Sequence, residues 1–202
     1  MGEDRISPYP WRSAKDPYRI IIAEMLLQRT RRDVVIKLYN DFISRYPTPK
    51  ALAEADPEEV KNLIKPLGLA KRAQYLVNFA RKYTAMRPKS FSELLKLPGV
   101  GPYIASITSI MVYGDERVAV DKNVARVIMR IYDITPENKN RPQDDHQILR
   151  IVNECMPKDN VKEYNLALLD LGWEICRPRN PLCNKCPLKN GCVYFRKTSK
   201  LT

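Results

Sequence analysis

Residues 97–127 read LPGVGPYIASITSIMVYGDERVAVDKNVARV and combine a glycine-rich turn with a lone acid that heads a helical segment. The stretch opens with a glycine-punctuated turn, Leu97–Gly101, which leads into an apolar helical segment. Glycine backbone can approach an anion closely, and the amides at a helix N-terminus bind phosphate. A second helical segment then begins with one acid, Asp121. The pattern predicts a phosphate-holding turn with a carboxylate beside it, although Asp121 could equally be an ordinary helix N-cap.

The composition indicates a globular chain with a basic surface. Hydrophobic residues make up 44% of the 202 residues and charged residues 29%, and no apolar run approaches the roughly 20 residues of a membrane span. The 35 Lys and Arg residues against 23 Asp and Glu residues give a net charge of +12. This excess favours a polyanionic partner, although a merely soluble basic protein would carry it too. The polar N-terminus, which lacks a signal-peptide core, predicts an intracellular protein rather than a secreted one.

The hydrophobic pattern predicts an all-α protein. Only seven glycines occur, and no alternating strand-like runs are bounded by turn pairs. The first long helix is expected to start at Asp16, an N-cap, with Pro17 at the first helical position. Outside the central stretch, apolar residues at helical spacing and helix-stopping prolines place helices at 16–30, 33–46, 50–55, 57–64, 70–85, 90–95, 145–155 and 161–175.

Glu24 is unusual within the first predicted helix. Its helical neighbours three and four positions away include Ile20, Ile21 and Leu27. A carboxylate in apolar surroundings resists ionisation, which suits a general acid near neutral pH. The alternative is a glutamate at the edge of the apolar stripe that reaches water. The basic run that follows, residues 28–32, could contact nucleic acid or could be a solvated turn between helices.

Four of the five cysteines lie near the C-terminus, at Cys176, Cys183, Cys186 and Cys192. In an intracellular chain disulfides are a poor explanation, and four thiolates so close in sequence suit an all-sulfur metal site. Zinc ribbons use two CxxC pairs and this chain has one, so the spacing favours a 4Fe–4S cluster over zinc. The alternative is a set of reduced structural cysteines. The remaining one, Cys155, is expected to be a small core residue.

Together these motifs resemble the helix-hairpin-helix base-excision DNA glycosylases with a C-terminal iron–sulfur cluster, which include the endonuclease III-like and adenine-DNA glycosylases. The resemblance covers nearly the whole chain. It is carried by PWR at 10–12, DPY at 16–18, EMLLQRT at 24–30, the LPGVG turn, VDKNVARV at 120–127 and the four cysteines. It implies two helical lobes, a central one of residues 18–130 and a terminal one of residues 1–17 with 131–202. The terminal lobe would hold the cluster loop, residues 176–192.

The resemblance also implies roles for three polar residues. Asp121 matches the family's essential aspartate, and Asn123 matches the residue that helps to orient it. Glu24 matches the acid that protonates the departing base in the adenine glycosylases. These residues would hydrolyse an N-glycosidic bond after the target base is flipped out of double-stranded DNA.

Two groups of residues match the family's DNA contacts. In the hairpin, backbone amides would meet a DNA phosphate, where a monovalent cation often helps in the family. The segment at Gln28 and Arg29 would fill the gap left by the flipped nucleotide, and Leu69 would touch the opposite strand. The hairpin residues concerned are Gly99, Val100 and Gly101.

Tyr103 indicates which branch of the family the chain resembles. Bifunctional members carry a lysine at this place, and its amine cleaves the strand through a Schiff base. A tyrosine cannot form that imine, so a monofunctional enzyme without AP-lyase activity is expected. Adenine glycosylases tend to carry serine there, whereas tyrosine resembles the archaeal thymine-DNA mismatch glycosylases. The alternative is that Tyr103 is a buried helix aromatic without a role in substrate choice.

The resulting hypothesis is a monomeric base-excision repair enzyme that removes thymine or uracil mispaired with guanine. Only ten residues follow Cys192, so the further domain of typical adenine glycosylases is not expected. Two alternatives stay open. One is an adenine-DNA glycosylase acting on G·A mispairs, and the other is a non-catalytic DNA-binding protein that uses the hairpin for docking.

Overall fold

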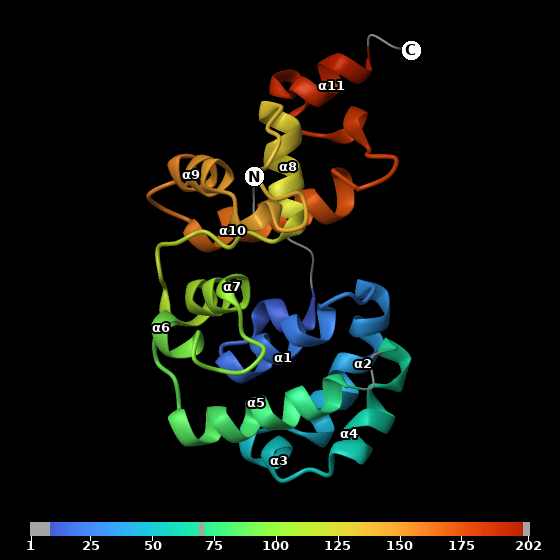
Figure 1. Ribbon diagram of the computed structural model, residues 1–202, viewed down its shortest axis with the longest axis vertical. Helices are drawn as coiled ribbons and strands as arrows, with labels where there is room; N and C mark the ends of the chain where they lie inside the picture. The colour runs from blue at the N-terminus through green and yellow to red at the C-terminus, as the bar shows by residue number, and fades with distance from the viewer. Residues whose placement is uncertain (1–8, 69–70, 200–202) are drawn as a thin grey trace. The chain divides into compact units, whose positions relative to one another are not determined.

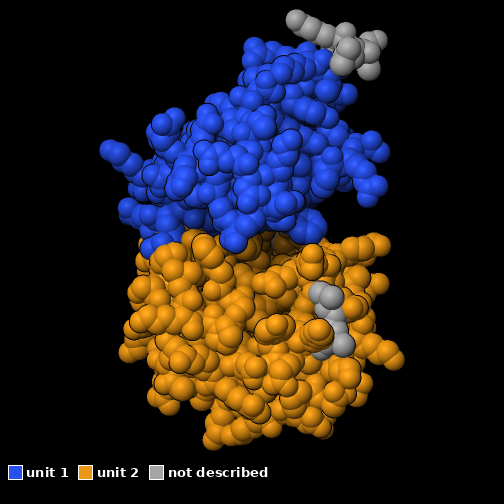
Figure 2. Space-filling view, viewed as in Figure 1, with its two compact units in different colours: residues 1–7, 116–202 blue, residues 8–115 orange. Residues whose placement is uncertain are grey.

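The computed structural model describes residues 9–68 and 71–199, and within them the chain is helical and contains no strand (Figure 1). The all-α prediction is confirmed. By internal contacts the chain divides into two compact units, residues 8–115 and residues 1–7 with 116–202 (Figure 2). Their described parts are called the N-terminal unit and the C-terminal unit below. The lobes expected from the resemblance divide near residue 130, whereas this division places Asp121 in the C-terminal unit.

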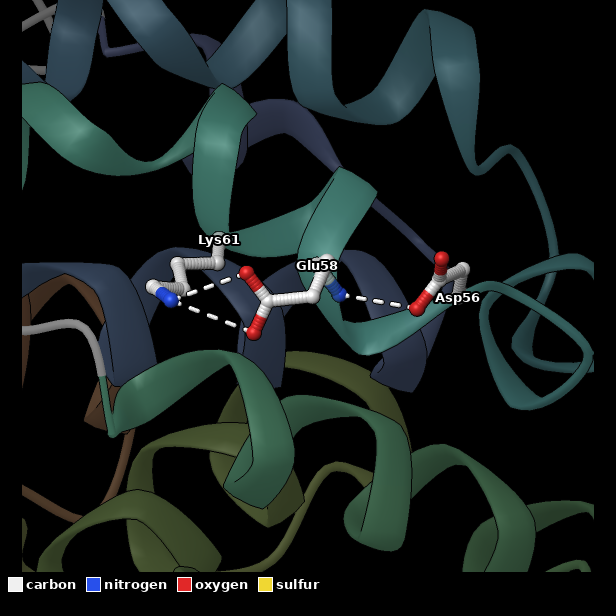
Figure 3. A network of polar contacts seen from close by, with 3 residues as sticks. All are labelled: Asp56, Glu58 and Lys61. Atoms are coloured by element: carbon white, nitrogen blue, oxygen red, sulfur yellow. Dashed lines mark hydrogen bonds and ion pairs between the residues drawn. The ribbon is translucent and has the colours of Figure 1, made fainter.

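The helices of the N-terminal unit begin where capping residues and prolines predict. Pro17, Pro49, Pro57 and Pro102 each occupy a first-turn position, where a missing N–H costs nothing. At α4 the Asp56 carboxylate accepts the Glu58 amide at 3.0 Å, and Lys61 pairs with Glu58 at 2.8 Å (Figure 3). The elements are η2 (Pro10–Ser13), α1 (Pro17–Leu27), α2 (Arg32–Arg45), α3 (Pro49–Ala53), α4 (Pro57–Leu63), η3 (Lys65–Leu67), α5 (Arg72–Met86), α6 (Phe91–Leu94) and α7 (Pro102–Tyr113).

The core of the N-terminal unit surrounds α1. This helix is apolar on nearly every side and packs against α2 and α7, as expected of a helix buried all round. Ile20, Ile21 and Leu26 are fully buried. Trp11 of the preceding segment packs into the same core. The elements that carry Glu24 and the hairpin therefore belong to one continuously packed body.

The C-terminal unit is built on an amphipathic helix and contains several short turns. α8 (Lys122–Tyr132) buries Val124, Ala125, Val127 and Ile128. α10 (Val161–Asp170) continues directly into a π-helical turn (Leu171–Ile175), a wider turn that is frequent at functional sites. The other elements are η4 (Pro142–Asp144), α9 (His146–Glu154), η6 (Cys183–Lys185), η7 (Lys189–Gly191) and α11 (Val193–Thr198).

Two predictions about local structure were wrong. Cys155 is exposed rather than buried, because it follows the end of α9, where its Sγ lies 3.8 Å from the Tyr132 hydroxyl. The first helix ends at Leu27 rather than at residue 30, because Gln28 leaves the helical conformation, with ψ 116°, and Arg29 adopts a left-handed conformation with φ 57°. No helix among the described residues is long and apolar enough to cross a membrane.

Candidate active site

Asp121 is the N-cap of α8, and its carboxylate is held on both oxygens. Oδ1 accepts the backbone amides of Asn123 and Val124, each at 2.8 Å, and Oδ2 accepts the Asn123 side-chain amide at 2.6 Å. Burial raises the pKa of Asp121, and these hydrogen bonds oppose that shift by favouring the ionised form. The N-cap role proposed as the alternative is thus confirmed, and it fixes a carboxylate that can also serve in chemistry.

Arg126 extends this network from Asn123 to the segment that precedes the cysteine loop. Its guanidinium donates to Asn123 Oδ1 at 3.0 Å, to the Gly172 carbonyl at 2.7 Å and to the Cys176 carbonyl at 2.9 Å. Donation to Oδ1 fixes which end of the Asn123 amide faces Asp121. A Cβ on Gly172 would lie 3.0 Å from Asn123 backbone and side-chain atoms, so glycine at this position favours the close approach.

The four cysteines of the C-terminal loop converge on one apolar cavity of about 30 Å³. Burial raises the pKa of the Cys183 thiol, and the other three cysteines raise it further. Arg130 on α8 donates to Cys176 Sγ at 3.4 Å and to the Arg177 and Pro178 carbonyls at 2.7 and 3.0 Å. By its chemistry, an all-thiol donor set is the kind that thiolate-bound metals and clusters use. No three His, Cys, Asp or Glu side chains of the described residues form a group that could hold a single metal ion.

The predicted hairpin is present between α6 and α7. Gly99 has φ 79°, a backbone conformation that favours glycine, and a Cβ there would lie 2.9 Å from the terminal methyl of Met25 on α1. Val100 is buried, and Gly101 is the exposed N-cap of α7 with open space around its Cα. The exposed start of α7 thus offers backbone amides of the kind that bind phosphate.

The structure places Glu24 and Tyr103 on neighbouring helices of the N-terminal unit. Glu24 lies on α1 and Tyr103 in the first turn of α7, and both are partly buried. The two helices pack against each other, and Tyr103 packs on the hydrophobic core. Gln28 and Arg29 are exposed at the end of α1, as a DNA contact requires, while Leu69 lies outside the described residues.

The comparisons with known proteins identify the family. A model described as "HhH-GPD superfamily base excision DNA repair protein" matches residues 22–157. The chain belongs to this superfamily. It is 39% identical over 92% of its length to a thymine-DNA glycosylase of Aeropyrum pernix, of which it covers 86%. It is 35% identical over 95% of its length to a thymine/uracil-DNA glycosylase of Pyrobaculum aerophilum, of which it also covers 86%.

A solved structure agrees with the superfamily assignment. A thermostable thymine-DNA glycosylase superimposes with a TM-score of 0.84 at 32% identity, covering 96% of this chain and 91% of that one. The superfamily fold of this chain contains polar residues that the sequence did not single out, Arg126 and Arg72. Arg126 lies one helical turn after Asn123, a spacing that could have revealed it. Arg72 contacts a residue 46 positions away, which no local pattern indicates.

Proposed function

We propose that this protein is a DNA glycosylase of base excision repair that hydrolyses the N-glycosidic bond of thymine or uracil mispaired with guanine. The observation that carries the proposal is the similarity to thymine and thymine/uracil-DNA glycosylases over 92% and 95% of the chain. The net charge of +12 suits a DNA partner. A mispaired base is already poorly stacked, which lowers the cost of flipping it. Because its substrate would be cellular DNA, the protein would act inside the cell.

Asp121 would act on the sugar. As the glycosidic bond breaks, positive charge develops on the deoxyribose, and a fixed carboxylate stabilises that charge or orients the attacking water. Three hydrogen bonds hold the carboxylate before substrate binds, so little reorganisation is needed at the reaction step. Asn123 would orient it, and Arg126 would hold the Asn123 amide with its NH2 group toward Asp121.

Glu24 and Tyr103 would meet the departing base. The Glu24 carboxyl could bind or protonate the pyrimidine, and the Tyr103 hydroxyl could donate a hydrogen bond to it. Tyr103 has no amine, so the enzyme would release the base without cleaving the strand. The hairpin amides, with the predicted monovalent cation, would hold a phosphate, and Gln28, Arg29 and Leu69 would occupy the opened duplex.

The cysteine loop would hold a 4Fe–4S cluster through Cys176, Cys183, Cys186 and Cys192. The cluster would supply structural cross-linking of this loop. Arg130 and Arg126, which donate to carbonyls of the loop, would then connect a fixed loop to the helix that begins at Asp121. A yellow-brown colour and iron in stoichiometric amount on purification would support iron over zinc.

One experiment tests the activity. The protein is incubated with duplexes carrying G·T, G·U or G·A, and the strands are analysed with and without alkali. We expect breaks in the G·T and G·U duplexes only after alkali, because base release leaves an abasic site that alkali cleaves. Breaks restricted to G·A would instead support the adenine glycosylase, and binding without base release would support the non-catalytic alternative.

The role of Tyr103 has its own test. In Tyr103→Lys an amine replaces the hydroxyl, and a borohydride-trapped adduct with DNA is expected. Tyr103→Phe serves as the control that cannot trap. Absence of the adduct, with base release retained, would contradict the position proposed for Tyr103.

A further inference from the structure

A buried arginine, Arg72, holds the turn between α1 and α2. Only 7% of this residue is exposed. Its guanidinium donates to the Leu26 carbonyl at 2.9 Å, to the Thr30 hydroxyl at 3.0 Å and to the Gln28 carbonyl. The last carbonyls of a helix have no intrahelical donor. Arg72 therefore caps the end of α1 from the start of α5.

The charge of Arg72 is costly where it lies. Burial lowers its pKa, and its hydrogen-bond acceptors in the described part of the chain are neutral oxygens. The guanidinium supplies a planar fork of donors with fixed directions, which neither an apolar side chain nor an ammonium reproduces.

The turn that this fork holds has a strained backbone. Arg29 adopts φ 57°, a conformation that costs a non-glycine residue about 1–2 kcal/mol. Its side chain is exposed, so packing does not impose the conformation. The three acceptors of Arg72 lie on both sides of Arg29, at Leu26 and Gln28 before it and at Thr30 after it. Strained residues persist where their surroundings over-determine them, and Arg72 provides that restraint.

We infer that Arg72 is a positioning residue that makes the Gln28–Arg29 turn and the start of α5 one pre-formed surface for opened DNA. Gln28, Arg29, Arg72, the exposed Tyr75 and Gly99 of the hairpin line a common pocket of about 310 Å³. Moving either segment would break the bonds between them. Arg72 thus acts on the separation of the base pair, before the chemical step. This inference assumes the proposed glycosylase activity.

The test compares Arg72→Met with wild type on two duplexes under single-turnover conditions. One has uracil opposite guanine, and the other has uracil opposite a tetrahydrofuran abasic analogue, where no partner base must be separated. We expect release from G·U to fall about 100-fold, the loss that a displacement of about 1 Å can cause. Release from the second duplex should fall far less, because no partner base has to be separated there. Arg72→Lys should lie between wild type and Arg72→Met on G·U, because an ammonium cannot reproduce the fork.

The control is Arg81→Met. Arg81 also extends from α5 to a helix-end carbonyl, that of Ala53 at 3.1 Å, but it does not line the pocket. It should leave both rates unchanged. Equal losses on the two duplexes in Arg72→Met, or no loss on either, would overturn the inference. If Arg72→Met does not fold, as thermal unfolding would show, Arg72→Lys alone must show the same difference between the duplexes.

A binding measurement separates this inference from the proposed function. Wild type should bind a duplex with tetrahydrofuran opposite guanine more tightly than a matched duplex, and Arg72→Met should lose about tenfold of that preference. This measurement needs no catalysis. Wild type that releases no base would refute the glycosylase proposal, while the binding preference would still decide the role of Arg72.

Discussion

The two units hold their chemistry-bearing side chains by different means. In the N-terminal unit Glu24 and Tyr103 lie on α1 and α7, two helices held by a run of buried apolar residues. In the C-terminal unit Asp121 is held by a chain of hydrogen bonds through Asn123 and Arg126 to the backbone before the cysteine loop. Apolar packing is spread over many contacts, whereas a polar chain can be broken at one residue. The C-terminal unit should therefore be the more sensitive to single polar substitutions.

The largest effect is expected for Asp121→Asn. An asparagine keeps the N-cap but loses the negative charge, so single-turnover base release should fall about 10²–10³-fold or more, the scale of one lost preorganised electrostatic contact. Duplex binding should be largely retained, as measured by fluorescence anisotropy. Near-normal turnover would show that Asp121 takes no part in the reaction. The hydrogen bonds from Asn123 and Arg126 would then have only a structural role.

The same variant tests the raised pKa of Asp121. Because the folded-state pKa lies above the unfolded value, the folded state holds its proton more tightly, and stability is lost as pH rises through the folded pKa. The difference in melting temperature between Asp121→Asn and wild type should therefore increase from about pH 4 upward, in favour of the variant. A variant that is less stable than wild type at pH 7 would show that hydrogen bonding outweighs burial at this carboxylate.

The next effect is expected for the cysteine loop. Cys186→Ser removes one ligand of the proposed cluster and should lower base release about 10- to 100-fold or more, since even an outer-shell partner of a metal site contributes that much. Hydrogen exchange should accelerate in α8 and residues 171–192 and stay unchanged in α1 and α5, because the N-terminal unit does not depend on the loop. Cys155→Ser, at the exposed cysteine outside the loop, is the control. Equal acceleration in both units would contradict the comparison.

The sequence predicted most of the N-terminal unit because its helices depend on local signals. Prolines and capping residues at Asp16, Thr48 and Asp56 mark the helix starts, and the apolar pattern marks the buried sides. The end of α1 was mispredicted because Arg72, 46 residues from Leu26, sets it. Local propensity carries no information about a hydrogen bond of that separation.

In the candidate site the sequence indicated the functional residues but not the contacts that hold them in place. A lone acid before an apolar helix indicated Asp121, and four cysteines indicated a loop site. The close approach of Gly172 to Asn123 depends on a π-helical turn in another element. That contact and the bonds of Arg126 arise only when α8 packs against residues 171–176.

A smaller effect is expected for Arg126→Met, which removes the hydrogen bonds that link Asn123 to the Gly172 and Cys176 carbonyls. Loss of the bond to Asn123 should lower base release about tenfold or more, the lower end of what a supporting group contributes. Since Arg126 lowers the pKa of Asp121 through its charge, the acid limb of the pH–rate profile should move to higher pH. Arg150→Met, which removes an exposed ion pair with Glu154, is the control. Slower release without a shift of the acid limb would assign Arg126 a structural role only.

The smallest effects compare two left-handed helix ends, one in each unit. Arg87 after α5 has φ 47° and Asp133 after α8 has φ 60°. Glycine at either position should relieve a backbone strain of about 1–2 kcal/mol. It should also cost about 0.5–1 kcal/mol, because glycine loses more conformational entropy on folding. The free energy of unfolding should therefore rise by roughly 0.5 kcal/mol. In Asp133→Gly that gain should be cancelled, because Asp133 also pairs with Lys197 of α11, an exposed bond worth about 0–1 kcal/mol. Urea unfolding of the two variants measures both values. A larger gain in the free energy of unfolding for Asp133→Gly than for Arg87→Gly would contradict this expectation. It would mean that the ion pair between Asp133 and Lys197 does not stabilise the C-terminal unit.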